Sequence, residues 1–245
     1  MNQTNIHCHL PQQIQDEIKD CSLNLESFGK KHNLDFKQQK AFEIICCTFM
    51  LHCLEEKINM IQDREHSSFS DNLEHTHQCI LSNILNTESL NSLDELKKEL
   101  YKRGGRDHLI MCLSGQGGSG KSTTIFACNE FCLRFSQLLS MPFDDMTMCM
   151  TAYTGSAACL IKGATLHSVT GMCKTTSRVT DEERNKWKHN RSLVIDEYSF
   201  MSLGDLEKLD KSLKLRRPEY SDEVFAKSNI IFIGDLHQMT PIKGD

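Results

Sequence analysis

The chain has 245 residues, 39% of them hydrophobic, and a formal net charge of −5. This length accommodates one large α/β domain, or one domain with an added helical segment. No apolar run approaches the length of a membrane-spanning helix, so no membrane partner is expected. The acidic balance argues against a protein coated in basic surface, although a narrow basic groove for nucleic acid is compatible with it.

Twelve cysteines are present, most of them in apolar runs, where a reduced thiol behaves as a small buried hydrophobic group. The N-terminus lacks the basic and apolar regions of a secretion signal. These features predict an intracellular, reducing location, nuclear or mitochondrial in a eukaryote and cytoplasmic otherwise. Two clusters of metal-binding residue types, His7–His9 and His75–Cys79, lack the paired spacing of a zinc site, so no metal site is predicted from protein side chains alone.

The first hundred residues are predicted to be an extension followed by helices. Residues 1–33 are polar and without a clear period, which is typical of a poorly ordered or accessory extension. Apolar positions at helical spacing predict a helix over 38–55, and the polar residues 62–91 predict a loop with room for one short helix. A capping box at Ser92–Glu95 opens another helix, which Gly104 and Gly105 end.

After residue 105 the pattern changes to alternating strands and helices. Apolar runs predict strands at 108–113, 146–151, 192–196 and 229–233. Helices are expected after the glycine-rich run at 115–123, after Thr154 and after Ser202. The first strand, with the run Leu109–Leu113, is expected to be fully buried. The alternation predicts the α/β class, with a parallel sheet and helices on both faces.

The glycine-rich run has the form G-x-x-x-x-G-K-[ST], the phosphate-binding loop of nucleoside triphosphatases. Glycines let successive backbone N–H groups point at phosphate oxygens, and a helix beginning at Lys121 aims its N-terminal dipole at the same place. Lys121 is placed to reach the β- and γ-phosphates, and the Ser122 hydroxyl to bind Mg²⁺. The nucleotide-binding residues predicted here are Gly115, Gln116, Gly117, Gly118, Ser119, Gly120, Lys121, Ser122 and Thr123.

Two further strand ends carry polar residues suited to ATP hydrolysis. Asp196 is expected to hold Mg²⁺ and Glu197 to activate the attacking water, since both end an apolar strand. The alternative is an acidic pair that only solvates the sheet edge. Gln238 follows the last strand and is expected to sense the γ-phosphate. The absence of an Asn-Lys-x-Asp motif disfavours a GTPase.

The order of these motifs resembles the Pif-type DNA helicases, in the RecD-like branch of superfamily 1. The resemblance covers residues 34–245 and implies a first RecA-like motor domain that uses ATP and Mg²⁺ to move 5′ to 3′ on single-stranded DNA. It implies roles in DNA repair, recombination and telomere maintenance, and an adenine-reading role for Gln38. Residues on two loops at one sheet edge are expected to contact DNA phosphates: Thr154, Ser156, Thr165, His167 and Ser168.

Some features depart from the family or leave alternatives open. Tyr198 and Phe200 stand where the family usually has smaller residues. Residues 174–191 contain six basic and three acidic residues around Trp187, which suits either DNA stacking or core packing. The family's second motor domain, with its arginine, is expected after residue 245. Without it, the alternative is a nucleotide-binding module that binds ATP but is not a helicase by itself. An AAA-type ATPase is a weaker third possibility, because proteins of that class lack the Gly-Asp-x-x-Gln pattern that this chain has at residues 234–238.

Overall fold

The computed structural model describes residues 24–62, 84–85, 93–172, 179–235 and 237. The chain forms two compact units. The helical unit contains the described residues up to Gly105 together with Ala127–Pro142, and the sheet unit contains Arg106–Phe126 and the described residues from Phe143 onward. The two cysteine and histidine clusters near residues 7–9 and 75–79 lie outside the described residues.

The helical unit begins with a helix that the sequence pattern did not predict. Helix α2 spans Leu25–Lys31, inside the extension that was expected to be poorly ordered. Asn24 caps it, since its Oδ1 accepts hydrogen bonds from the backbone N–H groups of Glu26 and Ser27, at 2.9 and 3.1 Å. Leu25 and Phe28 are buried, at 1% and 0% exposure. The expectation is therefore wrong for residues 25–31, because two well-placed apolar side chains are enough to anchor a short polar helix.

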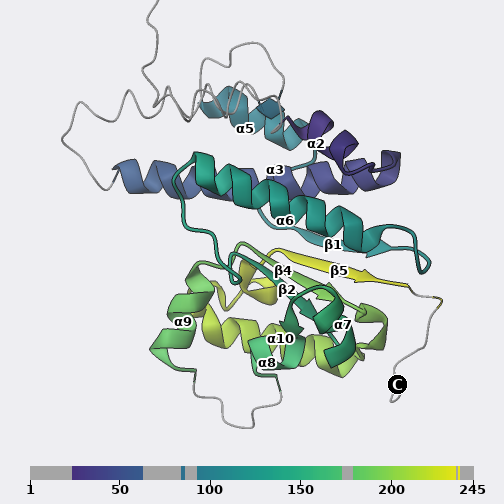
Figure 1. Ribbon diagram of the computed structural model, residues 1–245. Helices are drawn as coiled ribbons and strands as arrows, with labels where there is room; N and C mark the ends of the chain where they lie inside the picture. Colours follow the sequence, from purple (N-terminus) through teal and green to yellow (C-terminus); the bar gives the residue numbers. More distant parts are fainter. Residues whose placement is uncertain (1–23, 63–83, 86–92, 173–178, 236, 238–245) are drawn as a thin grey trace, which may run out of the picture. The chain divides into compact units, whose positions relative to one another are not determined.

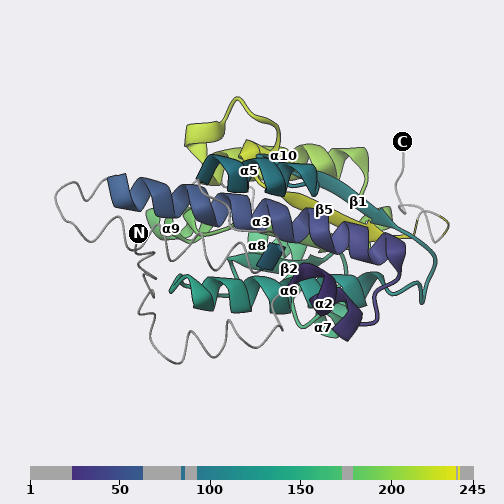
Figure 2. The same ribbon diagram turned by 90° about the horizontal axis from the view of Figure 1, so that it is seen from above.

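Three more helical segments complete this unit: α3 (Phe36–Gln62), α5 (Leu93–Lys102) and the part of α6 (Lys121–Leu138) from Ala127 onward. The two predicted helices correspond to α3 and α5, which lie side by side (Figure 2). Gly105 N–H donates to the Leu100 carbonyl and Gly104 has a φ of +104°, so these glycines end α5 as predicted. Ser92, the predicted cap, lies outside the described residues.

An aromatic cluster holds α2, α3 and the second part of α6 together. The ring of Phe28 stacks on that of Phe42 with 5.9 Å between centroids, and both meet the ring of Phe131 edge-on, at 5.5 and 5.6 Å. Cys46 lies fully buried in the same unit, and burial raises the pKa of its thiol well above the usual value. Such thiols act as small apolar groups, as the composition predicted.

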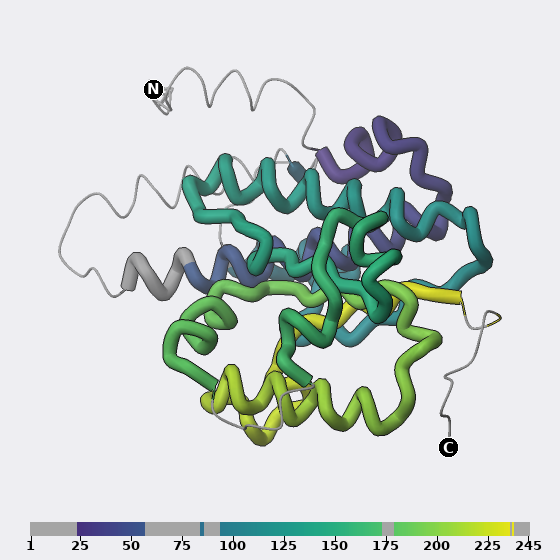
Figure 3. The backbone as a smooth tube through the Cα atoms, turned by 60° about the horizontal axis from the view of Figure 1, so that its bottom comes forward, coloured from purple at the N-terminus to yellow at the C-terminus, as the bar shows by residue number. Residues whose placement is uncertain are grey.

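The sheet unit is built on five parallel strands in the order β1-β5-β4-β2-β3 (Figure 1). The C-terminal strand, yellow in Figure 3, runs between the first strand and β4. The four predicted strands are confirmed within two residues, and β3 is an additional short strand. The strands are β1 (Ile110–Ser114), β2 (Met148–Ala152), β3 (Ala164–Thr165), β4 (Ser192–Asp196) and β5 (Ile230–Gly234).

Helices cover both faces of this sheet, as expected for the α/β class. Adjacent residues of β2 point to opposite faces. Cys149 packs in a core with Trp187, Leu209 and other residues of α8, α9 and α10, whereas Ala152 packs with the side chains of α7. The helices are α7 (Gly155–Leu160), α8 (Leu166–Thr170), α9 (Asp181–Lys188) and α10 (Leu203–Arg216), with 3-10 turns η2 (Tyr198–Phe200), η3 (Pro218–Tyr220) and η4 (Val224–Lys227). None of the helices in the described ranges combines the length and apolar character needed to cross a membrane.

Strand β1 corrects the expectation of a fully buried first strand. It is an edge strand whose residues alternate between exposed and half-buried positions, and Ile110 is 48% exposed. An apolar run of five residues is equally compatible with an edge or a central strand, because composition does not report the order of strands.

The structure decides between the two alternatives for Trp187. Residues 181–188 form helix α9, capped by a box in which Thr180 Oγ1 accepts from Glu183 N–H and the Glu183 carboxylate accepts from Thr180 N–H. Trp187 is only 2% exposed and packs in the sheet unit's core with Leu193 and Leu209. Core packing is therefore its role, and it is not available to stack on DNA bases.

The carboxylate of Asp205, in the first turn of α10, accepts hydrogen bonds from several donors. Ser202 and Asp205 form the predicted capping box, and the Asp205 carboxylate also accepts from the hydroxyl of Tyr153 at 2.9 Å and from Lys208 Nζ at 3.2 Å. Burial opposes ionisation of Asp205, but the hydrogen bonds outweigh it and lower the pKa of this carboxyl to about 2. The anion thus ties β2, through Tyr153, to the helix that follows β4.

Asp205→Asn is expected to lower the free energy of unfolding at pH 7 by about 2 kcal/mol. Because the folded-state pKa is lower than the unfolded value, the stabilisation is present above about pH 4 and disappears as the pH falls through about 2. Urea unfolding of the wild type and the variant across this range measures it, with the exposed Asp222→Asn as control. A difference between wild type and Asp205→Asn that does not shrink in acid would contradict the assignment.

Candidate functional site

The register of the parallel strands brings the predicted site residues to one edge of the sheet. Ala152, near the end of β2, is paired with Asp196 of β4 on one side and with Thr165 of β3 on the other. At the other end of the sheet, Ser114 of β1 is paired with Gly234 of β5. The carboxyl ends of these strands therefore lie along a single edge, where open α/β sheets hold ligands.

The phosphate-binding loop follows β1 at this edge. Gly118 and Gly120 have φ angles of +78° and +74°, a conformation that glycine adopts without strain. Lys121 Nζ donates to the carbonyls of Gly115 and Gln116, at 2.6 and 2.9 Å, so its ammonium lies over the loop. The glycines have the turned conformation that the sequence predicts, and the contact of Lys121 with phosphates stays a prediction.

Helix α6 begins at Lys121, as predicted for a helix whose N-terminus faces phosphates. Ser122 and Thr123 are exposed in its first turn, whereas Thr124 is buried and donates its hydroxyl proton to the Gly120 carbonyl at 3.1 Å. Ser122 is thus free of the core and open to a ligand. The loop and the exposed Ser122 hydroxyl fit a triphosphate carrying Mg²⁺, as the sequence predicts.

The acidic pair ends β4 as predicted. Asp196 is half-buried, and burial is the main reason why the pKa of its carboxyl is raised; the backbone N–H of Glu197 and the charge of Lys121 act in the opposite direction. The Glu197 N–H donates to Asp196 Oδ1 at 2.8 Å. Glu197 itself has a left-handed backbone, with φ 57° and ψ 36°, which costs a residue with a Cβ about 1 kcal/mol or more.

Thr154 contacts Glu197 directly. Its hydroxyl donates to Glu197 Oε2 at 2.5 Å and accepts from the backbone N–H of Ala157 at 3.3 Å, which caps α7. Ser156 lies beside it, with 3.3 Å between the two hydroxyl oxygens. Sequence reasoning placed Thr154 with DNA and Glu197 with ATP, and did not foresee that the two side chains meet.

The second predicted DNA loop lies on β3 and α8. Thr165 Oγ1 caps α8 by accepting from the backbone N–H of Ser168, and the two hydroxyl oxygens lie 3.0 Å apart. The ring of His167 meets that of Tyr153 edge-on, with 5.1 Å between centroids. Tyr153 directly precedes Thr154, so the chain and this ring contact connect the two loops. Their contact with DNA stays a prediction.

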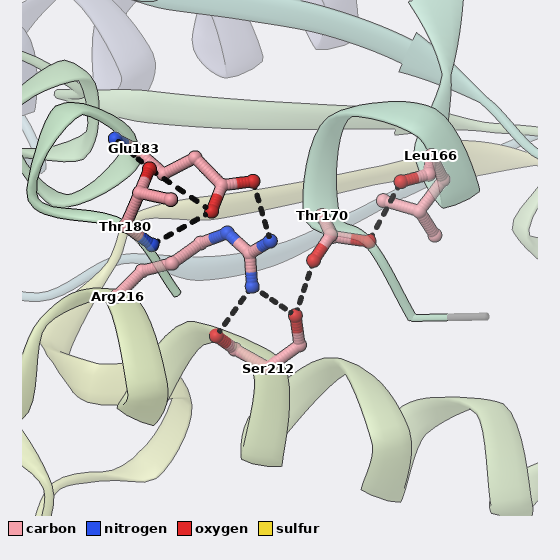
Figure 4. Close-up of polar contacts among 6 residues, drawn as sticks. All are labelled: Leu166, Thr170, Thr180, Glu183, Ser212 and Arg216. Atoms are coloured by element: carbon pink, nitrogen blue, oxygen red, sulfur yellow. Dashed lines mark hydrogen bonds and ion pairs between the residues drawn. The ribbon is translucent and has the colours of Figure 1, made fainter. Parts of the chain in front are cut away.

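A buried polar network fixes α8 against the helices behind it (Figure 4). Ser212 of α10 donates its hydroxyl proton to the Thr170 carbonyl at the end of α8. Arg216 Nη1 donates to Ser212 Oγ and to the Ser212 carbonyl, at 2.8 and 3.1 Å, while Nη2 lies 3.9 Å from the Glu183 carboxylate of α9. Burial lowers the pKa of Arg216, and the carboxylate of Glu183 counteracts this. The buried guanidinium thus contacts α9 and α10 directly and is connected to α8 through the Ser212 hydroxyl.

Two predicted glutamines do not belong to the described part of this sheet unit. Gln38 belongs to the helical unit and caps α3: its Oε1 accepts from Asp35 N–H, and Asp35 Oδ1 accepts from Gln38 N–H, both at 2.9 Å. Its adenine-reading role stays a prediction. Gln238 lies outside the described residues, although Asp235 just before it is buried and accepts from the His237 N–H at 2.9 Å.

Tyr198, one of the departures from the family pattern, has a defined place beside the acidic pair. Its ring packs over Gly234, where a Cβ would come within 2.8 Å of the ring carbon Cδ1. Its hydroxyl lies 3.0 Å from the Cys112 thiol on β1. Burial and this thiol raise the pKa of Tyr198. No periodicity or motif in the sequence marks such a contact across β1, β5 and the turn after β4.

Comparisons with known proteins found both a family model and individual proteins that are similar to this chain. Residues 84–245 match the family model described as PIF1-like helicase. Uncharacterized protein 030L of invertebrate iridescent virus 6 is 31% identical over 169 residues, 61% of this chain and 30% of that protein. The ATP-dependent DNA helicase PIF1 of Saccharomyces cerevisiae is 27% identical over 162 residues, 62% of this chain and 18% of that protein.

Among solved structures, Bacteroides sp Pif1 in complex with ADP-AlF4 is 26% identical, with a TM-score of 0.43, over 56% of this chain and 30% of that one. The chain therefore spans less than a third of the length of these three proteins.

Ser212→Ala is expected to destabilise the protein by about 1–3 kcal/mol, because it removes the donor of the Thr170 carbonyl and one acceptor of a buried arginine. Urea unfolding measures the change, with the exposed Ser221→Ala as the matched control, which should change stability by less than about 0.5 kcal/mol. Equal unfolding midpoints for the two variants would show that the network is not stabilising.

Proposed function

Because this chain belongs to the PIF1-like helicase family, we propose that it supplies the first motor domain of an ATP-dependent DNA helicase that unwinds in the 5′-to-3′ direction. The observation that carries the proposal is the convergence on one sheet edge of a phosphate-binding loop, a strand-end acidic pair and hydroxyl-bearing loops. Relatives named as ATP-dependent DNA helicases support the substrate class.

ATP is the proposed nucleotide, held by the backbone of residues 115–120 and by Lys121. The ammonium of Lys121 now shares its protons among loop oxygens, and phosphate oxygens are stronger acceptors for the same protons. Ser122 and Asp196 are the proposed Mg²⁺ ligands, Asp196 acting through water. The metal ion, when bound, neutralises charge on the phosphates. The raised pKa of Asp196 reflects a half-buried carboxylate that a cation would stabilise.

Glu197 is the proposed general base that activates the attacking water, and Gln238 the proposed γ-phosphate sensor. The strained backbone of Glu197 supports this role, because it fixes the direction of the side chain independently of the helix that follows. Gln38 is proposed to read the adenine, although its carbonyl oxygen already serves the cap of α3.

Single-stranded DNA is the proposed partner of the two loops, through Thr154, Ser156, Thr165, His167 and Ser168. Hydroxyl groups and helix N-termini are suited to phosphate oxygens and carry no base preference, which fits a motor that must step along any sequence. Roles in repair, recombination and telomere maintenance are consistent with the family, and an intracellular location remains a prediction.

Binding of a fluorescent ATP analogue with Mg²⁺ tests the nucleotide site. Lys121→Ala is expected to weaken binding by about ten- to a hundredfold, because a charge-assisted hydrogen bond to phosphate is lost. Removal of Mg²⁺ with a chelator should also weaken it. Lys211→Ala, an exposed lysine on α10, is the control and should bind as the wild type does. Equal affinities of the two variants would contradict the proposed site.

ATP hydrolysis measured with and without single-stranded DNA distinguishes a motor domain that is active by itself from a nucleotide-binding module. Stimulation by DNA that Lys121→Ala abolishes supports a motor domain active by itself. ATP binding with little DNA-stimulated hydrolysis, which we expect of this chain alone, supports the narrower role of a nucleotide-binding module. A chain that binds neither ATP nor DNA contradicts both.

A further inference from the structure

The hydrogen bond from the Thr154 hydroxyl to Glu197 connects a proposed DNA-binding residue with the proposed general base of ATP hydrolysis. The backbone sets it up: the Tyr153 N–H donates to the Asp196 carbonyl at 3.1 Å, which continues the β2–β4 pairing beyond the paired residues Ala152 and Asp196. Thr154 follows Tyr153 and Glu197 follows Asp196, just past the ends of β2 and β4, and their side chains meet at 2.5 Å. Both are half-buried, so the bond is shielded from solvent in part.

The threonine hydroxyl has one proton to donate. Here that proton is directed at Glu197 Oε2, while the oxygen accepts from Ala157 N–H as the cap of α7. The Ser156 hydroxyl oxygen lies 3.3 Å from that of Thr154. As long as the Thr154 hydroxyl donates to Glu197, Ser156 can only be a donor to the Thr154 oxygen. A DNA phosphate is a pure acceptor and needs the same proton. One hydroxyl cannot serve a carboxylate and a phosphate together, and the two anions also repel each other.

We infer that Thr154 is a positioning residue whose hydroxyl donates its hydrogen bond either to Glu197 or to DNA, but not to both: a DNA backbone phosphate accepts the hydrogen bond of the Thr154 hydroxyl, which keeps its proton, and the Glu197 carboxylate is released. The inference rests on the proposed function, since it takes Glu197 as the general base and Thr154 as a DNA contact. It adds a specific route by which DNA releases the base, with no rearrangement of the sheet. Coupling of this kind is reciprocal, so Glu197 must in turn weaken DNA binding.

The backbone of Glu197 is held independently of its contact with Thr154. Its N–H is bonded to Asp196 Oδ1 at 2.8 Å, and its carbonyl accepts from the Phe200 N–H at 3.1 Å. When DNA releases the Glu197 carboxylate, this carboxylate loses Thr154 as its hydrogen-bond partner, while the backbone of the turn after β4 stays as it is. Glu197 is left beside the phosphate-binding edge with its lone pairs free to accept a proton from water.

The test is a double-mutant cycle on DNA affinity, which needs no hydrolysis. The whole 245-residue chain is titrated with a fluorescein-labelled oligo-deoxythymidine and followed by anisotropy. The four proteins are wild type, Glu197→Ala, Thr154→Val and the double variant. Glu197→Ala should tighten DNA binding by about tenfold in the wild-type background, because the hydroxyl no longer has to leave a carboxylate. In the Thr154→Val background the same change should give less than about a twofold effect.

Further variants separate positioning from folding. Thr154→Ser keeps the hydroxyl and should restore the full effect of Glu197→Ala. Cys159→Ser, an exposed position on α7, should leave DNA affinity and its response to Glu197→Ala unchanged.

The outcomes are distinct. Equal effects of Glu197→Ala in the Thr154 and Thr154→Val backgrounds overturn the inference, since removal of the negative charge alone then explains them, and the proposed function stands. A wild-type chain that binds the fluorescent ATP analogue but no DNA overturns both the DNA-binding role and the inference. Coupling that Thr154→Ser preserves supports both.

Discussion

The in-register pairing of parallel strands is the constraint on which the proposed site depends. Parallel strands end at one edge, and pairing of Ala152 with both Asp196 and Thr165 decides which residues meet there. A slip of one residue would exchange the two faces of β2, moving Cys149 out of its core and Thr154 away from Glu197. The strand register that buries the core residues therefore also brings the proposed site residues together. At Gly163 an added Cβ would lie 2.2 Å from the Met150 carbonyl oxygen, so glycine is required where β3 returns to this register.

The sequence is informative where chemistry depends on neighbouring residues. The phosphate-binding loop, the acidic strand end, the capping box of α10 and the four main strands are all visible in short windows, because glycine conformations, caps and apolar periods are local properties. Their order along the chain was enough to indicate the family. The edge position of β1 and the burial of Trp187 were not visible, since both depend on which strands and helices become neighbours.

Contacts between motifs are the part of the site that only the folded chain reveals. Thr154 and Glu197 are 43 residues apart, and each was understood separately. Tyr153, which touches His167 and Asp205, had no predicted role although it directly precedes a predicted DNA contact. Helix α2 shows the same limit on a smaller scale, because the rings that bury Phe28 come from α3 and α6. Side-chain partners across elements are set by topology, which a single sequence does not state.

The distribution of thiols makes the sheet unit selectively open to chemical labelling. Within the described ranges, Cys112 on β1 and Cys159 on α7 are the exposed cysteines, whereas burial raises the pKa of Cys47 and Cys149 to about 12 and leaves them almost without thiolate. Among the cysteines of the described ranges, a maleimide dye would accordingly react first at Cys112, beside Tyr198, and at Cys159, on the helix that Thr154 caps. The fold thus supplies its own attachment points for spectroscopic reporters of nucleotide and DNA binding.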